Sequence, residues 1–222
     1  MHFVPELRRH FINNRNEIDA KAMQAYMKNK FVFFGIKSVQ RKTILKEAIH
    51  SNKEEVTSNI SEIAKVLYSM HEREFHYCAM ETFARFKKRN YLKADIEFIT
   101  YLITTNSHWD SVDFIAKHIL GQFLLEHPYM REETISKLSQ SQNMWLNRAS
   151  ILFQLGYKEK TDAKLLFQVC NAHKHSDEFF IQKAIGWALR EYAKYNSDAV
   201  INVVKTSELK PLSQKEALKH FK

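Results

Sequence analysis

Residues 106–121 read NSHWDSVDFIAKHILG, and this stretch carries clear signals for both ends of a helix. The helix is predicted to begin at Asn106 or Ser107, because either side-chain oxygen can accept a backbone N–H of the first turn. Asp110 then lies near the positive end of the helix dipole. Gly121 is placed to end the helix in a left-handed cap. We therefore expect one helix over this stretch.

Trp109 and Asp113 are four residues apart and share one face of this helix. An aromatic ring and a carboxylate side by side suit a cation that develops during a reaction, since both present negative charge to it. The simpler interpretation is that Trp109 packs in the core and that Asp113 forms a surface ion pair with Lys117, one turn further on. These two residues alone leave both interpretations open.

The composition of the whole chain favours helices over strands. Its 222 residues include only 4 Gly and 3 Pro, too few turn-forming residues for a sheet of many strands. Leu, Ile, Lys, Glu, Ala and Phe recur at helical spacing, and strict alternation is scarce. The length is sufficient for a sizeable core. We predict an all-α fold in which residues 1–222 form a single domain.

The charge balance points to a polyanionic partner. Lys and Arg number 34 against 25 acidic residues, which gives a net charge of +9. An excess of this kind favours nucleic acid over a membrane surface. The longest strongly apolar run, Phe31 to Ile36, is far too short to span a bilayer. We therefore expect no membrane partner.

The cysteines and the first residues favour a reducing compartment. Cys78 and Cys170 are the only cysteines and lie far apart in the sequence, so a disulfide is not expected. The sequence MHFVPELRRH at the start lacks the apolar core of a secretory signal. These features predict a cytoplasmic protein.

A degenerate repeat emerges around the central stretch. Phe75, Trp109, Trp145 and Phe180 each lie near the start of a predicted helix, at steps of 34 (109 − 75), 36 (145 − 109) and 35 (180 − 145) residues. Another helix is predicted in each interval, over residues 92–104, 129–138 and 162–172. Two-helix units of this length are typical of helical solenoids, whose stacked units leave a long concave surface.

The repeat brings unusual side chains into register. If the second helix of each pair lines the concave face, that face receives Trp109 and Asp113, then Arg148, then Lys183 and Trp187. A solenoid with an apolar interior has no need of an acid, two bases and two tryptophans at matching points of successive units. We therefore predict that these side chains converge in one groove.

The N-terminal third contains a second candidate contact with a polyanion. Gly35 interrupts an aromatic run and predicts a bend pressed against the core. Ser38 can cap the helix that follows, and Lys37, Arg41 and Lys42 surround its start. A capped helix start with nearby cations can hold a phosphate. The alternative is an ordinary solvated helix end.

Several segments carry a close resemblance to a known family. They are YMKNKFVFFGIK (26–37), HWDSVDFI (108–115), MWLNRASILFQLGYK (144–158), FFIQKAIGWALREYAKYN (179–196) and LSQKEALKHF (212–221). Together they resemble the AlkD family of alkylpurine DNA glycosylases in the same order and spacing, over nearly the whole chain.

This resemblance implies a fold and an activity. The fold would be a right-handed superhelix of HEAT-like repeats whose basic concave face cradles double-stranded DNA. The activity would be excision of positively charged N3- or N7-alkylated purines, such as 3-methyladenine and 7-methylguanine, in base excision repair. Such monofunctional enzymes leave an abasic site. The family also differs from most glycosylases in not inserting the lesion into a tight base pocket. We expect no cofactor, no metal and a monomer.

The resemblance also implies roles for individual residues. The family's catalytic carboxylate matches Asp113, its sugar-flanking tryptophans match Trp109 and Trp187, and its essential arginine matches Arg148. A tyrosine of the N-terminal helices matches Tyr26. The expected DNA-binding residues are Tyr26, Lys37, Ser38, Arg41, Lys42, Lys183 and Arg190.

Two positions depart from the family pattern. His108 stands where family members have a second tryptophan before the one at Trp109, and Gly156 stands where some members have a lysine. Both departures leave the expected catalytic residues in place. They affect the contacts that are expected to hold the DNA.

Other function classes are weighed against this one. The alternative is a non-catalytic helical-repeat scaffold that binds DNA structures or a protein partner, but the acid, the arginine and both tryptophans are retained. No HExxH or other recognised metal-ligand spacing is present, so a metal hydrolase is disfavoured. The sequence also has no Gly-rich phosphate loop and no GxSxG motif, which disfavours ATP use and serine-hydrolase chemistry.

Overall fold

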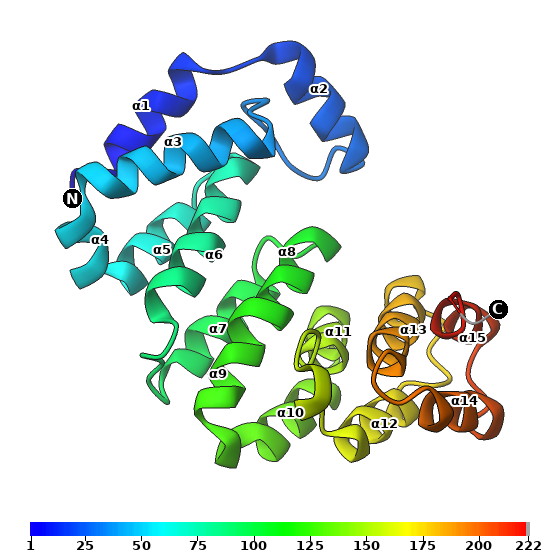
Figure 1. The fold of residues 1–222 in the computed structure, drawn as a ribbon. Coiled ribbons are helices and arrows are strands. Elements are labelled where there is room, and N and C mark those ends of the chain that lie inside the picture. Colours follow the sequence, from blue (N-terminus) through cyan, green and yellow to red (C-terminus); the bar gives the residue numbers. More distant parts are fainter. Residues whose placement is uncertain (221–222) are drawn as a thin grey trace. The chain divides into compact units, whose positions relative to one another are not determined.

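Helix follows helix through residues 1–220, the part of the chain that the computed structural model describes (Figure 1). The only extended pairing within these residues is an isolated bridge between Val32 and Glu72. The predicted all-α fold is confirmed. The chain divides into two compact units, Met1–Asn90 and Tyr91–Lys222. The right-handed superhelix and the single domain stay predictions.

The first unit is formed by short helices around an aromatic centre. Its elements are α1 (Phe3–Asn13), α2 (Glu17–Tyr26), α3 (Ser38–Ser51), α4 (Lys53–Ser58), α5 (Ile60–Tyr68) and α6 (Arg73–Lys87). Helix α1 packs on α3, and α5 packs on α6. The ring of Phe75 lies 5.2 Å from that of Phe11 and 5.6 Å from that of Phe34, measured between centroids. Because these rings come from three different segments, they tie the unit together.

The predicted bend before α3 is pressed against the core and is held by a buried carboxylate. Glu74 accepts hydrogen bonds from the backbone N–H groups of Phe34, Gly35 and Ile36, at 3.2, 3.0 and 3.1 Å. Gly35 has φ of +86°, and a Cβ there would lie 2.0 Å from the carbonyl oxygen of Asn16. Only glycine fits this position, both for its backbone angle and for its space.

We expect Glu74→Gln to lower the free energy of unfolding by about 1–3 kcal/mol, the cost of one buried unsatisfied donor. The remaining amide oxygen can accept from Gly35 and Ile36, which share Oε1, but the amide NH₂ would then face the N–H of Phe34. Urea unfolding followed by circular dichroism measures the change. Glu62→Gln, at an exposed position of α5, is the matched control. Equal stability of the two variants would contradict this account of the bend.

The second unit carries the repeat positions Trp109, Trp145 and Phe180, whereas Phe75 lies in α6 of the first unit. The elements of the second unit are α7 (Asp95–Thr104), α8 (Trp109–Phe114), the π-helix η1 (Ile115–Leu120), α9 (Gly121–Glu126), the 3-10 turn η2 (Pro128–Met130), α10 (Arg131–Ser139), α11 (Met144–Leu152), the 3-10 turn η3 (Lys158–Lys160), α12 (Ala163–Ala172), α13 (Phe179–Ala193), α14 (Ser197–Thr206) and α15 (Pro211–Ala217). Helix α11 packs on both α8 and α13, and α10 packs on α12. The second helices of successive pairs therefore form one layer, as the repeat predicts.

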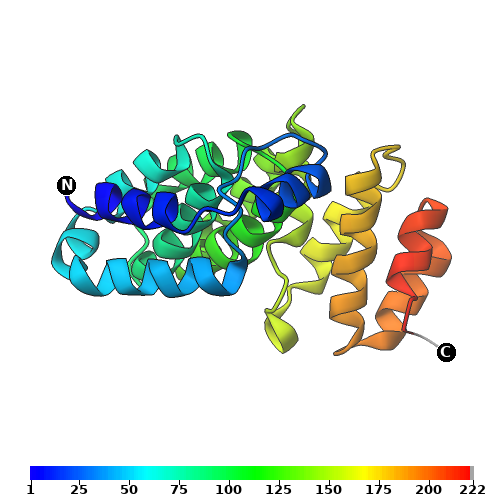
Figure 2. The ribbon, with the colours of Figure 1, turned by 90° about the horizontal axis from the view of Figure 1, so that it is seen from above.

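The last pair of helices in this layer is packed very closely. Figure 2 shows α13, in gold, beside α15, in red. A Cβ at Gly186 would lie 2.3 Å from the Cβ of Glu216 and 2.9 Å from the carbonyl oxygen of Ser213. Glycine at this position is what lets the two helices approach one another.

The central helix differs from its prediction at both ends. It begins at Trp109, and His108 is the N-cap residue. Asn106 lies in the left-handed region, with φ of 49°, and so does not cap the helix. The backbone N–H of His108 donates to Ser111 Oγ at 3.4 Å, and that hydroxyl donates to the His108 carbonyl at 3.1 Å. The capping residues proposed from the sequence are therefore wrong.

Gly121 does not end the central helix either. Its φ is −58°, and the helical run continues from α8 through η1 into α9, which ends at Glu126. A Cβ at Gly121 would lie 2.4 Å from the carbonyl oxygen of Phe153. A glycine is needed here because the helix packs closely against the end of α11. In the sequence, this glycine has the spacing expected of a residue that ends a helix.

Candidate active site

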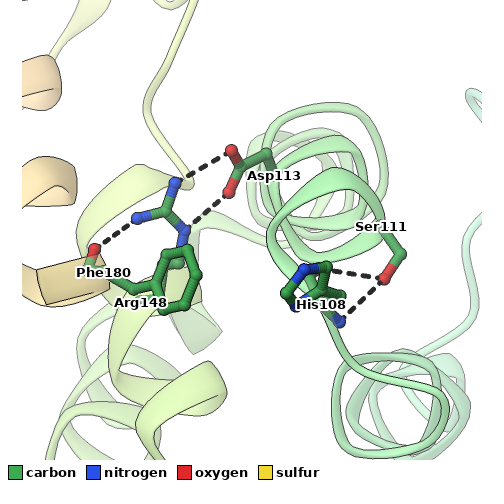
Figure 3. Close-up of polar contacts among 5 residues, drawn as sticks. All are labelled: His108, Ser111, Asp113, Arg148 and Phe180. Atoms are coloured by element: carbon green, nitrogen blue, oxygen red, sulfur yellow. Dashed lines mark hydrogen bonds and ion pairs between the residues drawn. The ribbon is translucent and has the colours of Figure 1, made fainter. Parts of the chain in front are cut away.

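Asp113 and Arg148 form an ion pair between two neighbouring helices of the second unit. Arg148 Nε lies 2.7 Å from Asp113 Oδ1, and its Nη2 lies 2.9 Å from Oδ2 (Figure 3). The third nitrogen, Nη1, donates to the Phe180 carbonyl at the start of α13. Such a two-point pair fixes the orientation of the carboxylate as well as its charge. Asp113 thus pairs across to α11, and the surface pair with Lys117 does not form.

The pair is largely shielded from solvent but not sealed. The side chain of Arg148 is 5% exposed and that of Asp113 is 15% exposed. Burial raises the pKa of Asp113, and the nearby Asp110 adds to this, whereas the hydrogen bonds and charge of Arg148 oppose it. Since an arginine stays protonated in proteins, Arg148 is a permanent cation beside this carboxylate. The site therefore offers a fixed, partly exposed carboxylate that can stabilise positive charge.

An aromatic cluster lies where three helices begin. The ring centroids of His108 and Trp145 are 5.8 Å apart, those of Trp145 and Phe180 are 5.1 Å apart, and those of His108 and Phe180 are 5.8 Å apart. His108 is buried in this cluster. The cluster fixes the starts of α8, α11 and α13 beside the ion pair. Trp145 and Phe180 are repeat positions in the sequence, but nothing in the sequence predicts the mutual contact of these rings.

The two candidate tryptophans come from the same layer. Trp109 is the first residue of α8, one turn before Asp113, and Trp187 lies two turns into α13 beyond Phe180. Both are partly exposed. The structure thus brings Asp113 and Arg148 into direct contact and places each tryptophan on a helix of the site. That the two rings flank a sugar stays a prediction.

Lys183 and Arg190 are engaged with the last helix. Lys183 Nζ lies 2.7 Å from Oε1 of Glu216, and Arg190 Nη1 lies 2.8 Å from its Oε2. The hydrogen bonds from Lys183 and then from Arg190 lower the pKa of Glu216 to about 2. These contacts fasten α15 to α13. The DNA contacts expected of both cations stay predictions, and their charge is shared with this carboxylate.

The candidates in the first unit differ in exposure. Tyr26 is 72% exposed, and Ser38 and Lys42 are also exposed. The exposed Lys37 forms an ion pair with Asp19 at 3.0 Å. Ser38 is the first residue of α3, and Lys37 before it is the N-cap residue and makes no side-chain cap hydrogen bond. The prediction that Ser38 caps this helix is therefore wrong.

Arg41 is turned inward and serves the core of the first unit. It is 4% exposed, and its two terminal nitrogens lie 2.8 and 2.7 Å from the carboxylate oxygens of Glu81. Its Nη1 also lies 3.6 Å from Cys78 Sγ. The guanidinium cannot meet a phosphate without breaking this ion pair. Its partner lies 40 residues away, so the sequence could not distinguish this arginine from its exposed neighbours.

Residues 1–220 contain neither a candidate metal centre nor a candidate membrane span. No group of three or more His, Cys, Asp or Glu side chains in this range could hold a metal ion. Over the same residues, no helix is both long enough and apolar enough to cross a bilayer.

Comparison with known proteins agrees with this fold. Residues 7–221 match the family described as DNA alkylation repair enzyme. The chain is similar to a solved structure described as a predicted DNA alkylation repair enzyme from Enterococcus faecalis, with 31% identity and a TM-score of 0.85, covering 93% of this chain and 96% of that one. It also resembles smu.31 from Streptococcus mutans UA159, with 18% identity and a TM-score of 0.60, over 82% of this chain and 98% of that one. The second likeness shows the fold alone. Comparison with curated proteins gave no match.

Proposed function

Because the chain belongs to the DNA alkylation repair enzyme family, we propose that it is a monofunctional DNA glycosylase acting on alkylated purines. Its substrates would be positively charged N3- and N7-alkylated purines in duplex DNA, with 3-methyladenine and 7-methylguanine among them. The observation that carries the proposal is the partly exposed carboxylate of Asp113, held at two points by Arg148.

The chemistry of these lesions explains why one carboxylate can suffice. Alkylation at N3 or N7 puts a positive charge on the purine. When the bond between C1′ and the base nitrogen breaks, its electron pair moves to the base, which leaves as a neutral molecule without a general acid. Positive charge then builds on the deoxyribose. Water forms the new bond at C1′, and its proton passes to Asp113 or to solvent.

Asp113 would stabilise the sugar cation and orient the attacking water. A fixed anion stabilises the transition state more than the neutral sugar of the bound substrate, and this difference is what accelerates the reaction. Burial strengthens the effect because the surroundings of the carboxylate screen its charge less than water does. The 15% exposure of this side chain leaves a path for contact with the substrate.

Arg148 would act through Asp113. An arginine at this position could hold a phosphate or fix the local geometry. All three of its guanidinium nitrogens bond to protein oxygens, on Asp113 and on Phe180. These bonds support the second role, in which the arginine holds the carboxylate at a set angle between α8, α11 and α13.

Trp109 and Trp187 would contact the sugar and the DNA backbone around the lesion through their rings. Aromatic faces attract a nearby cation and so add to the effect of Asp113. The product would be an abasic site, which makes the protein the first enzyme of a base excision repair sequence. We propose that it works as a monomer in the cytoplasm, on double-stranded DNA, without a cofactor.

This scheme predicts strong selection by lesion charge. In single-turnover assays on otherwise identical duplexes, the protein should release 7-methylguanine. The rate of uracil release should equal the rate measured without enzyme. The reason is that neutral uracil leaves poorly without an acid or a base pocket. Comparable rates for the two lesions would rule the scheme out. Binding of both duplexes with release of neither would favour the non-catalytic scaffold.

A further inference from the structure

Lys117 is an exposed cation close to the candidate site. It lies in η1, four residues beyond Asp113 on the same continuous helical run. The carboxylate of Asp113 is bound to Arg148, and within the described part of the chain no acidic side chain pairs with Lys117. The pKa of the adjacent His118 is lowered, first by burial and second by the positive charge of Lys117. Lys117 is thus a positive charge near the site that no acidic side chain of residues 1–220 neutralises.

The side chain of Lys117 extends over Gly156. This glycine follows α11 and has φ of +90°, a conformation that other residues rarely adopt. A Cβ built on Gly156 would lie 3.3 Å from Lys117 Cε and within 4 Å of no other heavy atom outside its own neighbourhood. The lysine therefore runs across a patch of bare backbone, and no side chain at position 156 stands between its ammonium group and solvent.

Lys117 and Arg148 connect the same two parts of the second unit. Arg148 reaches from α11 to Asp113 on α8. Lys117 reaches in the other direction, from η1 to the loop that follows α11. Both side chains thus lie along the seam between these neighbouring helices. Asp113 and Lys117 belong to one continuous helical run, so a molecule that follows this run can meet both side chains.

We propose that Lys117 binds a backbone phosphate beside the nucleotide whose sugar faces Asp113. This inference rests on the proposed function for its ligand. Lys117 lies four residues beyond Asp113, a distance of about 6 Å at the rise of about 1.5 Å per residue of an α-helix, and a DNA strand rises about 3.4 Å per nucleotide. This spacing corresponds to one or two nucleotides along a strand that follows the helix. Lysine suits this task, because it binds phosphate as a point charge on a long stem.

The test is the salt dependence of binding to an undamaged duplex, which no base release can disturb. Fluorescence anisotropy gives the Kd between about 50 and 200 mM salt for wild type, Lys117→Met, Lys117→Arg and Lys164→Met. Lys164 is an exposed lysine of α12 in the same unit and is the matched control. Each phosphate contact contributes about 0.9 to the slope of log K against log salt.

Lys117→Met should reduce the magnitude of that slope by about 0.9 and weaken binding about eightfold at 0.1 M salt, since one factor of [salt] to the power −0.9 is lost. Lys117→Arg should keep both values, and Lys164→Met should match wild type. If Lys117→Met has the wild-type slope, the inference is wrong and the lysine only covers Gly156 with its apolar stem.

The outcome is independent of whether the protein is a glycosylase. Release of bases from methylated DNA by wild type, with no change of slope in Lys117→Met, would overturn the phosphate contact and leave the proposed function standing. A lower slope in this variant, with no base release by wild type, would support the contact and overturn the proposed activity.

Discussion

Asp113→Asn should reduce base release by about 10²- to 10³-fold under single-turnover conditions, the range seen when one electrostatic contact to a transition state is removed. An amide has nearly the shape of the carboxylate but carries no net charge, so it cannot stabilise the sugar cation in the same way. The measurement is the rate of 7-methylguanine release from a duplex with a single lesion.

Folding and DNA binding must be checked beside that rate, because the new amide would also face the guanidinium of Arg148 with fewer acceptor atoms. Circular dichroism and the Kd for undamaged duplex report the two properties. If the variant folds, binds and still releases the base within a few-fold of the wild-type rate, Asp113 is not the catalytic group.

Arg148→Met should cost both activity and stability. Breaking a buried ion pair from one side leaves the other charge uncompensated, which typically costs about 3–5 kcal/mol. The loss of the guanidinium also removes the influence that lowers the pKa of Asp113, so this pKa rises further. A larger fraction of the carboxyl group is then protonated near neutral pH, and we expect release to fall about 10²-fold.

The pH profile separates this effect from simple misfolding. In the proposed scheme the anion of Asp113 is the active form, and its population grows as the pH rises through the pKa. Arg148→Met should therefore regain part of its activity at higher pH, with the acidic limb of the profile displaced upward relative to wild type. Arg148→Lys retains a charge but cannot form the two-point pair, and it should be intermediate. A loss of activity that is the same at every pH would contradict the positioning role.

The repeat explains how much of the site could be predicted from the sequence. Its step of about 35 residues puts Arg148 in register with Asp113, 35 positions earlier, and the two side chains do meet. Composition and spacing were sufficient for the all-α class and for the order of the helices that carry the repeat, because both depend on local pattern. The sequence was therefore sufficient to predict which side chains of successive helices lie on the same face.

What escaped prediction depends on contacts between distant segments. The partners of Arg41 and Lys183 are Glu81 and Glu216, and nothing in the local pattern reveals them. Gly121 has the spacing of a helix cap, but a glycine is required there because the carbonyl group of Phe153 in the next repeat leaves no space for a Cβ. Such demands arise only when the helices are packed, so an isolated stretch of sequence does not display them.

The most direct test of the central claim is to incubate the protein with methylated duplex DNA and to identify the released bases by chromatography, with Asp113→Asn in parallel. We predict that wild type releases 7-methylguanine and 3-methyladenine and that the variant releases almost none. Retained DNA binding without release of either base by the wild-type protein would contradict the claim and would make the protein a DNA-binding scaffold.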